Sequence, residues 1–240
     1  MAALGSISLR NIGRPRRAAL QTGYNCRVAH PDLPTGEKWR QFELKALGLR
    51  DFAGVRQDAP LNPFDLAQFA NLLVVDMDQL GDLSAKSKEH LLGPASEEWS
   101  GGACSQVLPD GQRIVILNPN HGPARTKATL MEEICHVFLG HQPNRLSVIA
   151  NSETGRTLAR DYRKLDEEAA YAIGAAALVP FSTLRRLVLA GKTSTEIAAY
   201  FRVSRDLIQY RLKVTHLWKM YKTAHSETIT RPKQDRLRIS

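Results

Sequence analysis

The sequence predicts an α+β protein with a small sheet, helices packed around it and a further group of helices towards the C-terminus. Residues 72–76 form a short β-rich run, and residues 98–104 and 113–118 have the pattern of paired strands around a turn at 109–111. Residues 146–150 are a further candidate strand. Apolar spacing, caps and stops predict helices over residues 38–49, 84–92, 122–139, 165–178 and 181–189.

The composition predicts a soluble intracellular protein. Of the 240 residues 43% are hydrophobic, which suits a domain with its own core. No run reaches the roughly 18 apolar residues of a membrane span, and residues 1–17 lack the order of a secretory signal. Three cysteines without paired spacing favour reduced thiols. We therefore expect a cytoplasmic location and no membrane partner.

The net charge of +9 is concentrated at the two ends of the chain. Residues 1–28 carry five arginines and no acidic residue, and residues 205–240 carry nine basic against three acidic residues. Such ends either attract nucleic acid or are simply solvated tails. We expect residues 1–36 to be a basic, flexible extension and residues 223–240 to be a basic tail.

The most informative segment is residues 129–141, which resembles the metal-binding helix of a zincin. In the pattern H-E-x-x-H, two histidines one helical turn apart bind one ion, and the glutamate between them is the general base. Here Glu132 stands in the place of the first histidine, Glu133 in that of the base and His136 in that of the second histidine. The motif is therefore E-E-x-x-H.

A third ligand is expected on the next helix, and Glu167 is the best candidate. Its position extends the stripe of small and apolar residues that includes Ala170 and Gly174, whereas Glu168 lies about 100° further round the helix. The alternative is an acidic first turn that only complements the helix dipole. For Glu132 and His136 the alternative is an ordinary i,i+4 pair, worth about 0.3–0.5 kcal/mol.

The ligand set Glu132, His136 and Glu167 offers one nitrogen and two oxygen donors. Such a set weakens the usual preference for zinc in favour of manganese or iron(II), because carboxylate oxygens are harder ligands that suit those ions. Cys135 points about 100° away from His136 and is expected to be a buried thiol. His141 follows the helix-ending Gly140 and is expected to support the ligands or the fold.

Residues 193–212 follow the helix-turn-helix template. Thr193 or Ser194 can cap the first helix with Glu196 in a capping box, and Ser204 can cap the second. The second helix could meet DNA or a protein partner, or the segment could serve packing alone. The candidate contact residues are Arg205, Asp206, Gln209 and Arg211.

Taken in order, these motifs resemble the ImmA/IrrE family of metallopeptidases over roughly residues 60–180. The segments that carry the resemblance are Pro60-Leu61-Asn62-Pro63-Phe64-Asp65-Leu66-Ala67, Arg125-x-x-x-Thr129-Leu130, Glu132-Glu133-x-x-His136-x-x-Leu139-Gly140-His141, Glu167 and Leu178-Val179-Pro180.

The resemblance implies a zincin-like minimal metallopeptidase domain at residues 37–180, followed by a helix-turn-helix-like segment at residues 181–222. It also implies Glu133 as the catalytic base and a divalent metal, either zinc or, given Glu132, manganese or iron. Better-understood members of the family cleave DNA-bound transcriptional repressors, so a protein substrate of that kind is expected. The alternative is a non-catalytic regulatory or DNA-binding protein on a degenerate peptidase scaffold.

Overall fold

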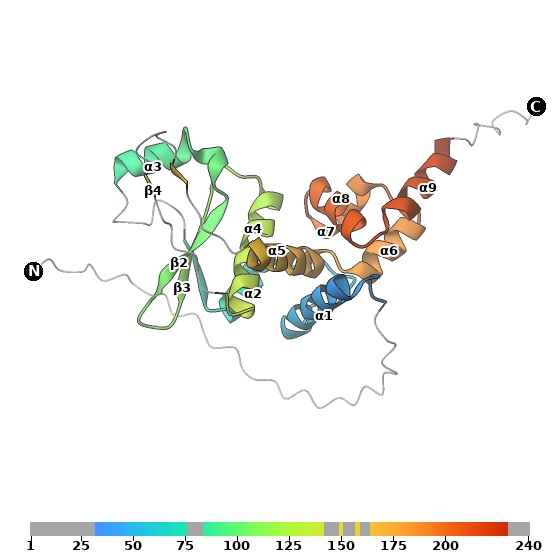
Figure 1. Cartoon of the computed structure of the whole chain (residues 1–240), viewed down its shortest axis with the longest axis horizontal. Helices are drawn as coiled ribbons and strands as arrows, with labels where there is room; N and C mark the ends of the chain where they lie inside the picture. The colour runs from blue at the N-terminus through green and yellow to red at the C-terminus, as the bar shows by residue number, and fades with distance from the viewer. Residues whose placement is uncertain (1–31, 76–83, 142–148, 151–156, 159–163, 230–240) are drawn as a thin grey trace, which may run out of the picture. The chain divides into compact units, whose positions relative to one another are not determined.

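The described part of the molecule has an α+β fold, as the sequence predicts (Figure 1). The chain divides into two units, Met1–Pro31 and Asp32–Ser240, and only residues of the second are described. The residues that the computed structural model describes are 32–75, 84–141, 149–150, 157–158 and 164–229.

A mixed three-stranded sheet is formed by β1 (Leu72–Val75), β2 (Gly101–Val107) and β3 (Arg113–Leu117), in the order β1-β3-β2. Strand β1 runs parallel to β3, and β2 pairs with β3 in the antiparallel direction, as expected for the predicted hairpin. Two short strands, β4 (Ile149–Ala150) and β5 (Thr157–Leu158), form a separate antiparallel pair.

Five helices accompany the sheet, and their starts follow the local sequence. Helix α2 begins at Pro63 and helix α4 begins at Pro123. Proline suits the first position of a helix because no helical hydrogen bond is lost there. A 3₁₀ turn, η2 (Ser96–Glu98), precedes β2. The helices are α1 (Glu37–Phe52), α2 (Pro63–Phe69), α3 (Ala85–Leu92), α4 (Pro123–Phe138) and α5 (Lys164–Leu178).

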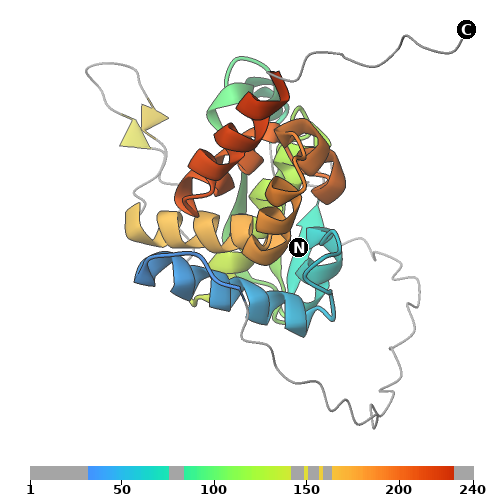
Figure 2. The same cartoon turned by 90° about the vertical axis from the view of Figure 1, so that its right-hand side faces the viewer.

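Helix α5 is the central helix, and it packs against both α1 and α4. Figure 2 shows α5 (yellow-orange) running alongside α1 (blue). Gly174 permits the approach to α4, since a Cβ at this position would lie 3.3 Å from Cγ of the fully buried Met131. The alanine-rich sequence of α5 thus serves close packing between helices, with buried residues Ala170, Ala172, Ala175, Ala176 and Ala177.

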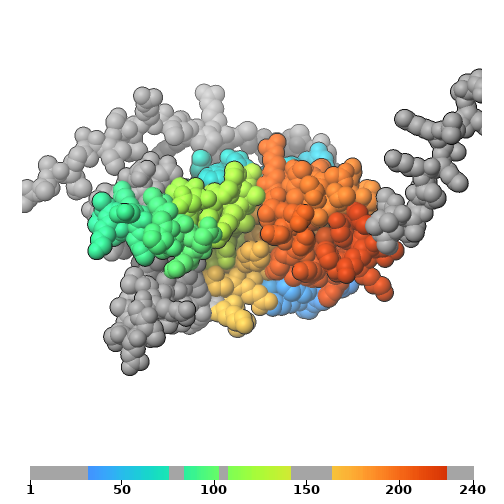
Figure 3. All heavy atoms as spheres, turned by 90° about the horizontal axis from the view of Figure 1, so that it is seen from above, coloured from blue at the N-terminus to red at the C-terminus, as the bar shows by residue number. Residues whose placement is uncertain are grey.

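Four more helices follow: α6 (Phe181–Leu189), α7 (Ser194–Phe201), α8 (Arg205–Val214) and α9 (Trp218–Ile229). Thr193 and Glu196 form the predicted capping box of α7, and the Ser204 hydroxyl accepts from the Leu207 amide at the start of α8. In the space-filling view these helices (orange to red) lie directly against the rest of the described chain (Figure 3).

Helix α9 was not anticipated, and it extends into residues expected to be a basic tail. Its aromatic residues Trp218 and Tyr221 stack with ring centroids 5.7 Å apart, and Tyr221 lies 4.2 Å from the ring of His225. The Tyr221 hydroxyl also accepts a hydrogen bond from the Ser194 amide. This hydrogen bond ties α9 to the start of α7, and α9 also packs against α6 and α8. The expected tail therefore begins inside a helix.

Among the described residues, no single helix is long and apolar enough to cross a membrane. Helices α5 and α6 taken together have the length and composition of a membrane span, but they are bent by 56° relative to one another.

Candidate metal centre

The three predicted metal ligands converge where the C-terminal half of α4 meets the first turn of α5. Glu132 and His136 share one face of α4, as the i,i+4 spacing requires. Glu167 comes from α5, and its Oε1 lies 3.2 Å from Nε2 of His136. One ligand atom from each residue lies within 4.8 Å of the other two. The structure thus brings together a nitrogen and two carboxylates from two rigid helices.

The site concentrates negative charge in a half-buried position. Burial, together with the charges of Glu167 and Glu133, raises the pKa of Glu132 to about 7. Burial lowers the pKa of His136, but the hydrogen bond that its ring donates to Glu167 and the charges of the surrounding carboxylates outweigh this effect, so the pKa rises. Carboxylates that repel one another in a partly desolvated site fit a divalent cation, because the cation stabilises their charged forms.

The predicted base and the predicted non-ligands also take defined positions. Glu133 is half-buried on α4, close enough to affect the pKa of both Glu132 and His136. Cys135 is fully buried in the core, and burial raises the pKa of its thiol, so it is an inert apolar residue as expected. Glu168 points away from the site and pairs with Nζ of Lys38 at 2.5 Å.

A second pair of residues lies directly behind His136. Nδ1 of His141 lies 3.0 Å from Nδ1 of His136, and Nε2 of His141 lies 3.6 Å from Oδ1 of Asp166. Sequence reasoning gave His141 a supporting role but did not connect it with Asp166. The signal that could have done so is the adjacency of Asp166 and Glu167, which start the same helix.

The predicted contact residues of the helix-turn-helix separate into two groups. Arg205 and Asp206 are exposed at the start of α8, and Gln209 is half-buried. Arg211 is only 2% exposed, so the expectation that it reaches DNA or a partner is wrong. Its Nη2 donates to Glu43 and its Nε to the carbonyl of Val179.

The burial of Arg211 follows from helical geometry. Arg211 follows Ile208 by three residues and precedes Leu212 by one, and both of these are fully buried. Arg211 therefore lies on the core side of α8. The apolar pattern of the sequence contains this information, but the positive charge suggests the opposite face.

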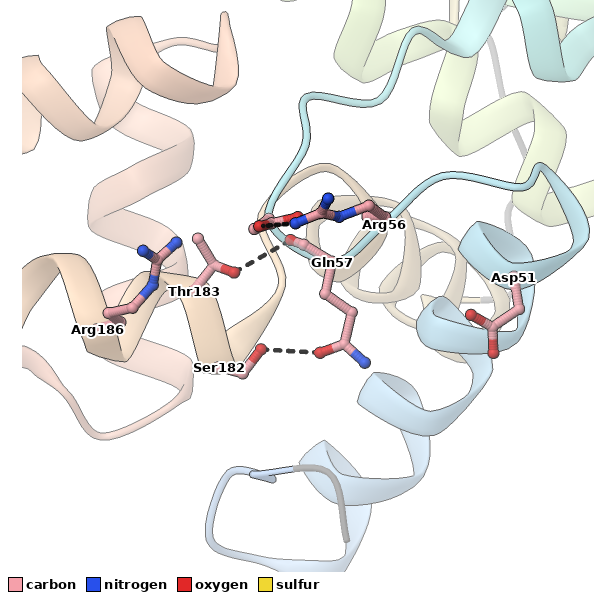
Figure 4. A pocket seen from close by; sticks show the side chains of 7 residues that line it. Asp51, Arg56, Gln57, Ser182, Thr183 and Arg186 are labelled. Atoms are coloured by element: carbon pink, nitrogen blue, oxygen red, sulfur yellow. Dashed lines mark hydrogen bonds and ion pairs between the residues drawn. The ribbon is translucent and has the colours of Figure 1, made fainter. Parts of the chain in front are cut away.

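An open pocket of about 550 Å³ lies at the junction of the end of α1, the following loop and the start of α6 (Figure 4). Ser182 and Thr183 donate hydrogen bonds to the side chain and the carbonyl of Gln57, and Arg56 pairs with Asp58. None of the predicted site residues lines this pocket, so the metal centre remains the candidate site. The lining residues are Asp51, Arg56, Gln57, Asp58, Ser182, Thr183 and Arg186.

Comparisons with known proteins agree with the class that the site defines, a metallopeptidase-like scaffold. Residues 96–213 match the family model described as the IrrE N-terminal-like domain. The matched segment includes α4, α5 and the helices through most of α8. The chain therefore carries a domain of the ImmA/IrrE family.

Among solved structures, the chain is similar to a Mycobacterium tuberculosis transcriptional regulator, with 16% sequence identity and a TM-score of 0.44. The alignment covers 72% of this chain and 46% of that chain, so this protein spans less than half the length of the regulator. A search of curated proteins finds no match.

Proposed function

We propose that this protein is a metal-dependent endopeptidase of the ImmA/IrrE type. The observation that carries the proposal is the convergence of Glu132, His136 and Glu167, whose ligand atoms lie within 4.8 Å of one another. The alternative, an ordinary ion pair within α4, would involve only Glu132 and His136 and would not need Glu167. The third group, from a separate helix, makes a three-point site, and three protein ligands leave the fourth position of a tetrahedral ion to water or substrate.

Each residue has a separate role in this proposal. Glu132, His136 and Glu167 hold the ion, and Glu133 takes a proton from the attacking water and returns it to the leaving amine. When bound, a divalent ion supplies polarisation of the scissile carbonyl and acidification of water. Because two of the ligands are anionic, we expect slower hydrolysis than a site with two histidines would give.

The ion is zinc in this proposal, with manganese and iron(II) as alternatives. Zinc is the usual ion for a site with nitrogen and carboxylate ligands and one open position. The second carboxylate, Glu132, makes the donor set harder and so reduces the difference in affinity between zinc and the other two ions.

The proposed substrate is a protein, such as a transcriptional repressor, in the cytoplasm. The family resemblance supports this class of substrate. The helix-turn-helix-like segment offers Arg205 and Asp206 at the exposed start of α8, where a protein or a protein–DNA complex could be engaged.

The first test is the metal content of protein purified without chelators or added metal. We expect about one equivalent in the wild type and none in the double variant Glu132→Ala/His136→Ala. Cleavage is then followed by mass spectrometry on a proteome-derived peptide library. Glu133→Gln should retain the ion and lose cleavage, which separates ligation from base catalysis. Absence of metal after dialysis against each of the three ions would contradict the proposal.

A second candidate function is a non-catalytic DNA-binding regulator on the same scaffold. The observation that favours it is the exposed basic side chains of the C-terminal helices. These residues are Arg202, Arg205, Lys213, Lys219 and Lys222. A metal-free, folded protein whose affinity for DNA falls steeply with salt, and falls again in Arg205→Ala, would support this candidate. Binding that does not depend on salt would exclude it.

A further inference from the structure

The helix-turn-helix-like segment meets α5 one helical turn from the metal centre. Tyr171 follows Glu167 by four residues, so the two side chains share a face of α5 and lie about 6 Å apart along its axis. The ring of Tyr171 meets the ring of Tyr210 on α8, with centroids 4.9 Å apart and an interplanar angle of 69°. This edge-to-face contact brings α8 beside the metal centre.

The exposed start of α8 adds a carboxylate to this pair of rings. Asp206 precedes Tyr210 by four residues, so it lies one turn away on the same face of α8. The cap of α8 is supplied by the hydroxyl of Ser204 and not by Asp206. Among the residues that the structure describes, no basic side chain forms an ion pair with Asp206. Its charge is therefore available to a ligand.

Tyr171 lies within electrostatic reach of both the metal centre and α8. Burial, together with the charges of Glu132 and Asp206, raises the pKa of the Tyr171 phenol. The first of these carboxylates belongs to the metal centre and the second to the start of α8. The rings of Tyr171 and Tyr210 are half-buried, so part of each ring remains in contact with solvent. The two rings thus form a surface that links the metal centre to Asp206.

Two phenol rings beside a carboxylate without a counter-charge fit a cation on a long side chain. An ammonium or guanidinium group is attracted to the face of an aromatic ring, and arginine also stacks flat on it. A carboxylate accepts charge-assisted hydrogen bonds from the same group. An apolar side chain would cover the rings and leave Asp206 without a counter-charge, and a phosphate of a nucleic acid would be repelled by it.

The distance from the metal centre suits a polypeptide that extends across it. Tyr171 lies about 6 Å along α5 from Glu167, and an extended chain advances about 3.3 Å per residue. A side chain that reaches the two rings therefore belongs to a residue about two or three positions from the bond at the metal centre.

We propose that Tyr171, Tyr210 and Asp206 form a specificity site that takes an arginine or lysine side chain of the polypeptide substrate. The proposal rests on the proposed function as far as the polypeptide is cleaved, whereas the binding of a basic peptide needs no catalysis. In this arrangement α8 recognises protein, because its face with Asp206 and Tyr210 adjoins the metal centre.

Binding is measured by fluorescence anisotropy with labelled decapeptide libraries and the metal-free protein. Each library has one fixed residue, either arginine, leucine or glutamate, in a mixture of alanine, glycine and serine. We expect the arginine library to bind about tenfold more tightly than the leucine library, and the glutamate library to bind least. Duplex DNA should not displace the arginine library. Equal binding of the three libraries, or displacement by DNA, would overturn the proposal.

Charge reversal separates recognition from a structural role. Asp206→Arg should reverse the order, so that the glutamate library binds most tightly. Asp65→Arg reverses an exposed acid in the first turn of α2 and is the matched control, with the order of the wild type. Tyr210→Phe keeps the ring and should bind as the wild type does. Tyr210→Ala should lose about tenfold in affinity for the arginine library alone. An unchanged order in Asp206→Arg would overturn the proposal.

Cleavage of the same libraries by the zinc-loaded protein distinguishes the two possible failures. If the arginine library binds selectively and no library is cleaved, the proposed function fails and the site stands as a peptide-binding site. If the libraries are cleaved at equal rates, and Asp206→Arg cleaves them as the wild type does, the specificity site fails and the proposed function stands. We expect cleavage about two or three residues from arginine.

Discussion

Arg211 on α8 and Glu43 on α1 form a buried ion pair, with Nη2 and Oε2 2.5 Å apart and side chains 3% and 1% exposed. The second oxygen of Glu43 accepts from the amide of Phe181 at 2.6 Å, and Arg211 donates to the carbonyl of Val179 at 3.0 Å. The pair thus satisfies backbone groups at the junction of α5 and α6. The helix-turn-helix-like segment is consequently tied to the metallopeptidase scaffold through its core.

Loss of one member of this ion pair should be severely destabilising. Arg211→Met leaves the Glu43 carboxylate buried without a counter-charge, and we expect a loss of about 3–5 kcal/mol in the free energy of unfolding. Urea denaturation measures this loss. The double variant Arg211→Met/Glu43→Leu should be less destabilised than the sum of the single variants, because no charge remains buried.

The exposed pair of Lys38 and Glu168 is the matched control for this experiment. Its side chains are 48% and 41% exposed, and Lys38→Ala should cost only about 0–1 kcal/mol. Equal losses in the free energy of unfolding for Lys38→Ala and Arg211→Met would mean that the buried Arg211–Glu43 pair matters no more for stability than an exposed pair.

Restoration of the first histidine should strengthen zinc binding. Glu132→His replaces a carboxylate, whose pKa is raised to about 7, by a neutral nitrogen ligand that suits zinc. We expect tighter binding of Zn²⁺ on the order of tenfold, or about 1.4 kcal/mol. Isothermal titration calorimetry checks this expectation, with Glu132→Gln as the comparison that should weaken binding. Equal affinity of Glu132→His and Glu132→Gln would argue against a ligand role for position 132.

The turn after α4 should depend on glycine. Gly140→Ala forces a Cβ into the left-handed region at φ +67°, and we expect a loss of about 1–2 kcal/mol in stability. Gly48→Ala is the matched control, because this glycine lies within α1 and a Cβ there has no neighbour within 4 Å. It should be neutral or stabilise by up to about 1 kcal/mol. Thermal unfolding of both variants separates backbone strain from side-chain contact.

The capping box of α7 should contribute stability that depends on pH. The hydrogen bond from Lys192, with those from the Thr193 amide and hydroxyl, lowers the pKa of Glu196 to about 2 from its ordinary value of 4.5. Because the folded-state pKa lies below the unfolded value, the contribution is present above pH 4.5 and is lost as the pH falls towards 2.

Glu196→Gln tests this dependence, since glutamine can keep the capping hydrogen bond without the charge. Its melting temperature should lie below that of the wild type at neutral pH, and the difference should narrow in acid. A difference that stays constant across this range would exclude the charge of Glu196 as its cause.

Much of the fold could be predicted because local patterns carry local information. The hairpin of β2 and β3, the helix with Glu132 and His136, and the stops at Gly140 and Pro180 all follow from spacing, turn residues and caps. Helix α9 shows the limit of this reasoning, because it continues to Ile229, into residues 223–240 that were expected to be a basic tail.

The sequence by itself determined which groups share a helix face. Spacing put Glu132 and His136 together and set Glu167 apart from Glu168, since a helical period is a property of consecutive residues. Tertiary structure alone decided what those faces meet. It brought Asp166 to His141, and it brought Glu43 to Arg211, a residue 168 positions away. Contacts of this kind depend on the packing of α1, α4, α5 and α8, which no local pattern encodes.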